Sequence, residues 1–292
     1  MKKQIFAVVL VVLLLLTGAA CGGTDAPQDG GQGDMTILSM GPSCTEILVA
    51  LGMGEYIIGV DTFSDGIPGL PSELPAFDMM AIDIEQVIAL APDVIFAAGI
   101  TQVDGLDPFE PAAALGIEVV HIPWAASIAE IKADIRLIAA AVDAEEAGEA
   151  LILKMNLEMD EIRAIAAEIE APRTVYFEIG APPFLFSFGQ GVFLHEMLEL
   201  VGAVNVFADQ DAWFSPADEA VLEANPDVIL TNVGYIDEPV EDVLNRPGWD
   251  VITAIQNGRV YFVDPDSSSR PSHHIVEAMW EMARAIYPEL FG

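Results

Sequence analysis

The sequence predicts an α/β protein with two similar lobes, each built on a parallel sheet, joined by a long helical segment. Two observations carry this prediction. The stretch EQVIALAPDVI at 85–95 has a second copy, EAVLEANPDVI, at 219–229. In each copy a Glu opens a helical turn, a Pro stops it, and an apolar run typical of a strand buried on both faces follows. Between the copies, residues 127–170 keep helical apolar spacing almost throughout.

The duplication extends beyond these copies. EILVALG at 46–52 precedes the first copy and EMLELVG at 196–202 precedes the second. GIEVVHIP at 116–123 and GRVYFVDP at 258–265 follow them. Because three pairs occur in the same order but at unequal spacing, they indicate two related lobes and not a tandem array.

The first lobe is expected at 35–126. A helix is predicted from Thr45 to Gly52, with Ser43 as its N-cap and Glu46 closing a capping box. Loops rich in Gly, Pro and Asp separate strands that are predicted from four short apolar runs: TILSM at 36–40, YIIGV at 56–60, VIFAA at 94–98 and IEVVHI at 117–122.

The helical segment is expected at 127–172. Asp143 divides it into two helices, the second roughly 25 residues long, and Pro172 ends it. A helix of that length at the join of two lobes can act as a stiff spine. The second lobe, at 173–292, is predicted to end with an amphipathic helix and to contain the strands TVYFEI at 174–179, VILT at 228–231 and RVYFVD at 259–264.

The N-terminus reads as a secretory signal. Lys2 and Lys3 precede an apolar run that is short for a membrane span, and small residues close the segment 1–20. Cys21 follows, and then a Gly-rich tether to residue 34. This resembles a bacterial lipoprotein signal in which Cys21 receives lipid, although Gly18 stands where Leu is usual. The expected location is therefore outside the cytoplasm, anchored to the membrane through this lipid only. Ordinary cleavage and a Cys21–Cys44 disulfide are the alternatives.

The chain is strongly acidic, with a formal net charge of -35. Such a surface repels nucleic-acid phosphates and anionic lipid headgroups, so no nucleic-acid partner is expected. Solubility or a salt-rich habitat would also account for the charge.

No motif for nucleophilic catalysis, phosphate binding or a cysteine-bound metal occurs. Apolar side chains stand out instead in loops after strands, where α/β lobes hold ligands. Aromatic rings there could line a cleft for a large flat ligand, or each could fill a local core. The residues concerned are Phe63, Met79 with Met80, Phe184, and Trp213 with Phe214.

The histidines raise the alternative of a metal site. His273 and His274 could ligate a metal, but adjacent rings point apart, and a solvent-exposed start of a helix is the other interpretation. His121 and His195 lie in apolar runs and read as core or boundary residues. A surface protein that binds a transition metal would need these four to converge with acids.

Glu85 and Glu219 are related by the duplication, and each opens a helix. As first-turn carboxylates they complement the helix dipole, worth about 0.3–1 kcal/mol each. Two carboxylates on two lobes would equally suit docking onto a partner that presents one basic residue to each lobe.

Taken together, the chain resembles the substrate-binding lipoproteins of ABC importers that have a rigid helical backbone and carry cobalamin, ferric siderophores or haem. The segments that carry the resemblance are PSCTEILVALGMGEYIIGV, DIEQVIALAPDVIF, LGIEVVHI, the long helix, and RPGW with AIQNGRVYFVD and SRPSHHIVEAM. The resemblance implies two Rossmann-like lobes with the ligand cleft between them, and no enzyme activity or resident cofactor. It implies a monomer that docks through Glu85 and Glu219 on a permease dimer with cytoplasmic ATPase subunits.

The residues that match the family's cobalamin binder are Phe63, Phe184, Trp213 and Arg270, whereas Met79 replaces a Trp and His274 an Arg. Phe214 is grouped with Trp213. Anionic chelates usually need several Arg or Lys in the cleft, and only Arg270 is expected there, which favours a near-neutral corrinoid. Ferric siderophores or haem are the alternative, with His273, His274 or Met79 as axial ligands of haem.

An enzyme is a rival from another class. Two-lobed α/β metal-cluster enzymes need several ligating Cys, and beyond Cys21 the chain offers only Cys44.

Overall fold

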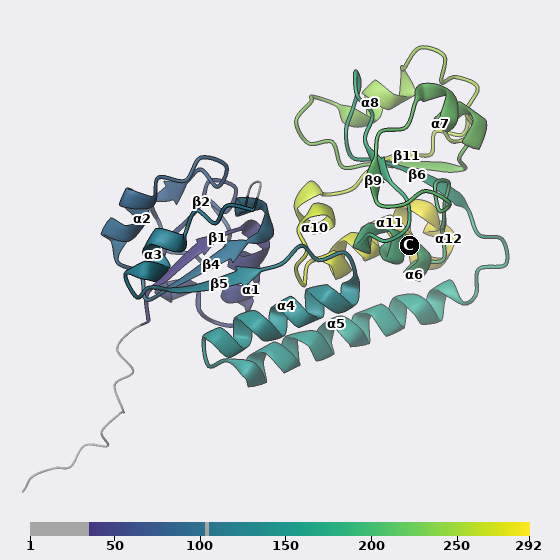
Figure 1. Cartoon of the computed structure of the whole chain (residues 1–292). Coiled ribbons are helices and arrows are strands. Elements are labelled where there is room, and N and C mark those ends of the chain that lie inside the picture. The colour runs from purple at the N-terminus through teal and green to yellow at the C-terminus, as the bar shows by residue number, and fades with distance from the viewer. Residues whose placement is uncertain (1–34, 103–104) are drawn as a thin grey trace, which may run out of the picture. The chain divides into compact units, whose positions relative to one another are not determined.

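The first lobe is organised on a parallel sheet with the strand order β3-β2-β1-β4-β5 (Figure 1). In this computed structural model, which describes residues 35–102 and 105–292, its strands are β1 (Ile37–Met40), β2 (Ile57–Asp61), β3 (Ala76–Phe77), β4 (Val94–Ala98) and β5 (Glu118–Ile122). Its helices are α1 (Pro42–Ala50), η1 (Gly54–Tyr56), α2 (Ile84–Leu90), η2 (Gly99–Thr101) and α3 (Glu110–Ala114). The four predicted strands are all present.

The second lobe repeats this plan with the order β11-β10-β6-β8. Its parallel strands are β6 (Thr174–Glu178), β8 (Val204–Asn205), β10 (Val228–Thr231) and β11 (Val260–Phe262), and β7 (Ser187–Phe188) pairs with β9 (Trp213–Phe214) in a separate antiparallel ribbon. Its helices are α6 (Phe193–Leu200), α7 (Asp218–Ala224), α8 (Pro239–Leu244), α9 (Thr253–Gln256), α10 (Pro265–Ser269), α11 (Ile275–Ile286) and α12 (Pro288–Phe291).

The duplicated Pro-Asp pair joins a helix to a strand in the same way in both lobes. The helix ends at a residue in the left-handed conformation, Ala91 with φ 49° or Asn225 with φ 43°. The following Asp then accepts hydrogen bonds from the backbone N–H and the hydroxyl of a Thr beside the neighbouring strand: Asp93 from Thr36 at 2.8 and 2.7 Å, and Asp227 from Thr174, both at 2.9 Å. The repeated Pro-Asp pair therefore links the start of β4 to the start of β1 in the first lobe, and the start of β10 to the start of β6 in the second.

Two antiparallel helices form the segment between the sheets. α4 (Ile128–Ala141) and α5 (Glu145–Ala166) lie side by side (Figure 1) and are separated by Asp143 at φ 52°. Gly148 permits their close approach, because a Cβ there would lie 2.7 Å from the Cβ of Ala139. At 22 residues, α5 is slightly shorter than predicted.

One apolar core connects these helices to both sheets. α4 packs on α1 and β5, whereas α5 packs on α6 and α11. The same cluster contains Phe96 of β4, Ile135 of α4, Met159 of α5 and Phe177 of β6, all buried. Continuous burial of this kind is the physical basis of a helical backbone between two lobes. Residues 35–292 accordingly form one compact unit, while the exact lobe boundaries stay predictions.

The expected signal at 1–20, the lipidation residue Cys21 and the tether at 21–34 lie outside the described residues. Within 35–102 and 105–292, no helix combines the length and the apolar character that crossing a bilayer requires.

Candidate ligand-binding site

The loops that follow β2, β4 and β5 surround a hollow of about 250 Å³, which we name the Trp124 pocket. Its walls are mostly apolar, and its polar residues are Ser43, Asp134, Ser269 and Arg270. The lining residues are Pro42, Ser43, Phe63, Met79, Ala98, Gly99, Ile100, Ile122, Pro123, Trp124, Asp134, Ser269, Arg270 and Pro271. An apolar hollow with a few polar groups is typical of a small-molecule site.

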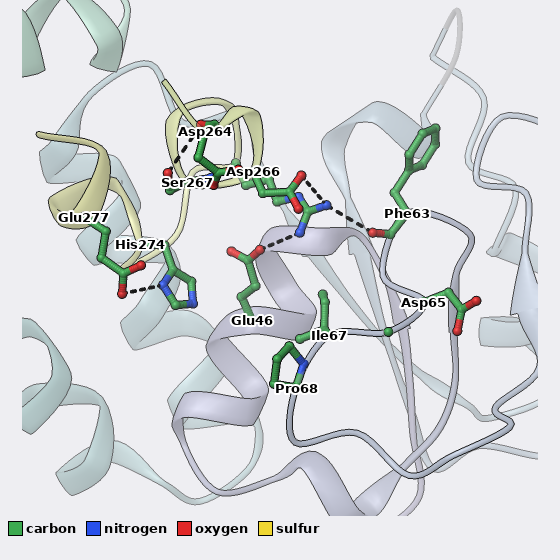
Figure 2. Close-up of a pocket in the computed structure, with 12 residues that line it drawn as sticks. Glu46, Phe63, Asp65, Ile67, Pro68, Asp264, Asp266, Ser267, His274 and Glu277 are labelled. Atoms are coloured by element: carbon green, nitrogen blue, oxygen red, sulfur yellow. Dashed lines mark hydrogen bonds and ion pairs between the residues drawn. The ribbon is translucent and has the colours of Figure 1, made fainter. Parts of the chain in front are cut away.

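A second hollow of about 260 Å³, the acidic pocket, shares Phe63 and Arg270 with the first. Figure 2 shows Glu46 of α1 facing the segment that carries Asp264 and Asp266, with the ring of Phe63 directed away from Glu46. Besides Arg270 and His274, five carboxylates line this pocket: Glu46, Asp65, Asp264, Asp266 and Glu277. The acidic pocket is therefore unsuited to an anion.

Arg270 is already neutralised by protein carboxylates. Its guanidinium donates to Glu46 at 2.8 Å and to Asp266 at 2.7 Å, and it also donates to the backbone carbonyl of Phe63 at 3.2 Å. Glu46 accepts a further hydrogen bond from the Ser272 hydroxyl at 2.5 Å. Arg270, predicted to contact the ligand, lines both pockets, and its charge is engaged by Glu46 of the first lobe and Asp266 of the second.

The capping box predicted at Ser43 and Glu46 is wrong. α1 begins at Pro42 with Gly41 as its N-cap, and no side chain caps it. Glu46 is buried and directed to Arg270 and Ser272, because a pairing across the fold satisfies this buried carboxylate better than a local backbone N–H.

Phe63 and Met79 both line the Trp124 pocket, in different ways. Phe63 is 60% exposed on its loop, whereas Met79 is 4% exposed and packs in the core beneath the pocket. Trp124 was not predicted. It is 70% exposed and lies over Gly99, where a Cβ would come within 2.8 Å of its ring. Its position directly after the predicted strand IEVVHI and Pro123 was the available signal.

The second lobe carries a separate group of exposed rings. Phe184 is 80% exposed, and Trp213 stacks on Phe186 with ring centroids 6.3 Å apart. Tyr235, also exposed, accepts a hydrogen bond from the N–H of Ala181 beside this loop. Phe186 and Tyr235 were missed by the sequence interpretation. Phe214, in contrast, packs edge-on against Phe207 and belongs to the core of its own lobe.

His273 and His274 form a turn before α11 and not a fully exposed helix start. Burial lowers the pKa of His273 to about 4, and its Nδ1 has no hydrogen-bond partner among the described residues. His274 lies 3.0 Å from Glu277 at the acidic pocket. His121 and His195 have separate partners, Asp107 and Glu199. Residues 35–102 and 105–292 contain no group of three or more His, Cys, Asp or Glu arranged to hold a metal.

Glu85 and Glu219 are exposed in the first turns of α2 and α7, at equivalent positions of the duplicated helix–strand junction. In the first lobe the N-cap Asp83 accepts hydrogen bonds from the N–H groups of Glu85 and Gln86. The helix terminus therefore does not require the Glu85 side chain as a cap, which leaves its carboxylate at the surface.

Cys44 is fully buried, and desolvation raises the pKa of its thiol to about 12. A thiol in this state is inert. Its proposed alternative partner, Cys21, lies outside the described residues.

The chain matches known proteins over this whole region. The periplasmic binding protein family model matches residues 37–267. The "Uncharacterized ABC transporter substrate-binding lipoprotein YvrC" of Bacillus subtilis is 34% identical over 257 residues, which cover 87% of this chain and 81% of the relative. A "Vitamin B12-binding protein" of Pectobacterium carotovorum is 28% identical over 196 residues, covering 66% of this chain and 70% of the relative.

Among solved structures, a possible iron-binding (periplasmic solute-binding) protein from Staphylococcus epidermidis superposes with a TM-score of 0.78 at 30% identity, covering 86% of this chain and 98% of that one. Two parallel-sheet lobes and a connecting helix pair define the class of an extracytoplasmic solute-binding protein. The chain belongs to the periplasmic binding protein family, in the branch of ABC transporter substrate-binding proteins. This family binds solutes for transport and is not an enzyme class. Substrate-binding proteins of this kind work with a permease and its ATPase.

Proposed function

We propose that this protein captures cobalamin or a related corrinoid outside the cytoplasm and delivers it to the permease of an ABC importer. The observation that carries the ligand assignment is electrostatic. Among the described residues that line the two pockets, Arg270 is the one Arg or Lys. It is paired with two carboxylates, and four further described acidic residues line the pockets around it. A ligand rich in carboxylates would meet repulsion there, whereas a large, amide-rich and nearly neutral corrinoid would not.

The aromatic side chains provide the contact surface for such a ligand. Phe63 and Met79 belong to the first lobe, and Phe184 and Trp213 belong to the second. The exposed rings of Phe63, Phe184 and Trp213 are costly in water and favourable against the flat face of a macrocycle, and Met79 lies beneath them in the first lobe's pocket. The relationship to a vitamin B12-binding protein at 28% identity supports the same ligand class.

Delivery is proposed to use Glu85 and Glu219, one on each lobe. Both are exposed, and their equivalence through the duplication fits a two-fold permease dimer that presents one basic residue to each. We propose that the protein acts as a monomer and is held at the membrane through a lipid on Cys21. The lipoprotein relative YvrC supports this anchoring.

The ligand assignment is tested by titrating the full chain, purified in detergent, with cyanocobalamin, haemin and a ferric hydroxamate. Tryptophan quenching and the visible absorbance of the ligand are recorded together. We expect saturable quenching by cyanocobalamin that is weakened at least roughly ten-fold in Trp213→Ala and Phe184→Ala. Leu153→Ala, which removes a similarly exposed side chain from α5, is the control. Absence of cobalamin binding would overturn the assignment.

Transport is measured separately from binding. With the cognate permease in liposomes, the double variant Glu85→Ala with Glu219→Ala should lose stimulation of ATP hydrolysis while it keeps the wild-type affinity for ligand. Glu223→Ala, another acidic residue of α7, should retain stimulation. Equal stimulation by all three proteins would contradict the docking proposal.

An iron chelate is the second candidate, and one feature favours it. His274 lines the acidic pocket beside His273, whose depressed pKa keeps its imidazole neutral and able to ligate at pH 7. The 30% identical structure described as a possible iron-binding protein supports the same class. A shift of the haemin Soret band that disappears in His273→Ala with His274→Ala would assign the protein to haem uptake.

A further inference from the structure

Asp134 is a buried carboxyl group that lines the Trp124 pocket. It lies on α4 between Ile131 and Ile135, both fully buried, and is itself 4% exposed. None of the hydrogen bonds or ion pairs among the described residues involves its side chain, and its oxygens are not among the fully enclosed polar atoms that lack a partner, so the carboxylate borders the pocket. A carboxylate with so little exposure and no protein partner is unfavourable for the ligand-free protein.

The charged and titratable groups around Asp134 do not neutralise the charge of its carboxylate. Glu130, one turn earlier on α4, and Cys44 of α1 both interact with it, and Asp61 at the end of β2 acts on Cys44 in the same sense. Arg270 reaches the pocket, but its guanidinium is bound to Glu46 and Asp266. Burial, and then the charge of Glu130, raise the pKa of Asp134 to about 6. The carboxylate is therefore largely ionised at pH 7.5, with no counterion among residues 35–102 and 105–292.

A structural role does not account for this residue. α4 is capped by Ser127, whose hydroxyl accepts from the N–H of Glu130 at 3.2 Å, so Asp134 is not needed at the helix start. What distinguishes the position is the pocket, where Trp124, Ile100 and Ile122 offer a largely apolar surface to a ligand and Asp134 offers a carboxylate acceptor.

We propose that Asp134 is a ligand-binding residue whose carboxylate accepts a hydrogen bond from an amide or hydroxyl group of the bound solute inside the Trp124 pocket. This proposal rests on the proposed solute-binding function. It narrows the range of ligands, because the negative charge of Asp134 excludes a peripheral carboxylate of the ligand from this position. The peripheral amides of a corrinoid have the required donor, and so do the amides of some ferric hydroxamates. Trp124 would cover the same ligand group.

The test compares the full-length wild-type chain with Asp134→Leu, Asp134→Asn and the control Glu130→Gln. Affinity for cyanocobalamin is measured by equilibrium titration at pH 7.5 and at pH 5. We expect Asp134→Leu to weaken binding roughly ten-fold or more at pH 7.5, as loss of a hydrogen bond to a charged group does. Wild-type affinity should fall at pH 5 because the carboxyl becomes protonated, and Asp134→Asn should lose this pH dependence. Glu130→Gln should keep the affinity at pH 7.5 but move the pH dependence to lower pH, because the charge of Glu130 contributes to the raised pKa of Asp134.

A second readout does not need a ligand. If the carboxylate is uncompensated until solute binds, Asp134→Leu raises the midpoint of thermal unfolding of the ligand-free protein at pH 7.5. A lowered midpoint would show that the fold itself uses Asp134 and would overturn the proposal. Wild-type-like affinity in Asp134→Leu at both pH values would overturn it as well.

The two hypotheses fail in different ways. If wild type does not bind cyanocobalamin, the corrinoid assignment is lost, and the same variants are compared with the ferric hydroxamate. A ten-fold loss with that probe supports the role of Asp134, whereas no loss, or a lowered unfolding midpoint, rejects it.

Discussion

Removal of Arg270 tests the contact that joins the two lobes in front of the pockets. Glu46 is 6% exposed, and its carboxylate oxygen lies 2.8 Å from the Arg270 guanidinium. With an effective dielectric constant of about 20 and charge centres roughly 4 Å apart, the attraction is about 4 kcal/mol. In Arg270→Leu the buried Glu46 keeps only the Ser272 hydroxyl. We expect a loss of about 3 kcal/mol, because removal of one partner leaves the other charge of a buried pair uncompensated.

This loss corresponds to a decrease of roughly 6–9 °C in the unfolding midpoint of a chain of this size. The assay is thermal and urea unfolding of wild type, Arg270→Leu, Glu46→Leu and the double variant. Because the double variant leaves only the exposed Asp266 without its partner and no buried charge, it should be more stable than either single variant. Arg163→Leu, which removes an exposed partner of Asp160 on α5, is the matched control and should not change stability measurably.

The argument is refuted if each single variant loses less than about 1 kcal/mol, or if the two losses simply add in the double variant. Either result would mean that solvent or rearrangement replaces the contact between Glu46 and Arg270. The lobes would then be held by the apolar core of α4 and α5 alone.

Three further predictions concern titration and reactivity. The pKa of His273 is lowered to about 4, so the unfolded chain takes up a proton that the folded chain does not as pH falls below 6.5. This side chain should lower the unfolding free energy by roughly 1–2 kcal/mol between pH 7 and 5, measured as the difference between wild type and His273→Leu, because Asp134 acts in the opposite direction over the same range. The pKa of Asp134 is raised to about 6, so the folded chain holds a proton between about pH 3.8 and 6 that the unfolded chain has lost, and the contribution of Asp134 to stability falls as pH rises through that window. In urea titrations, the unfolding free energy of Asp134→Asn should exceed that of wild type by roughly 1–2 kcal/mol at pH 7.5, and the difference should vanish near pH 4. Cys44, with its pKa raised to about 12, should not react with a thiol reagent at pH 8 in a folded Cys21→Ser chain, but it should react fully when the chain is unfolded in guanidinium. Rapid labelling of the folded chain would contradict the burial of Cys44.

The strands and the helical segment could be predicted because their signals are local and repeated. Pro92 and Pro226 stop a helix wherever they occur, and the β-branched runs after them need burial on two faces. The duplication itself indicated two equivalent lobes. The pairing of Asp93 with Thr36 could not be predicted in the same way, because the two residues are 57 positions apart and no sequence motif around Thr36 indicates the contact.

The errors at the site have the same origin. Ser43 and Glu46 have the spacing of a capping box, but Glu46 forms an ion pair with Arg270, 224 residues away, and this long-range contact prevails over the local motif. No sequence signal marks Asp134. Only the placement of α4 against the pocket reveals that its carboxyl lines the hollow with little exposure.

Charge links these findings to the choice of ligand. A chain with a formal charge of -35 already slows the approach of anions, and it also places its one pocket arginine between Glu46 and Asp266. Asp134 adds a further negative group inside an otherwise apolar hollow. The overall charge, the pairing of Arg270 and the carboxylate of Asp134 each weaken the binding of a ligand carboxylate. Asp134 also strengthens the binding of a ligand amide or hydroxyl group. Discrimination would then come from the cost of burying the wrong group as much as from the rings that bind the right one. Haemin, with its two propionates, should therefore bind more tightly to Asp134→Asn than to wild type, while cyanocobalamin should bind less tightly.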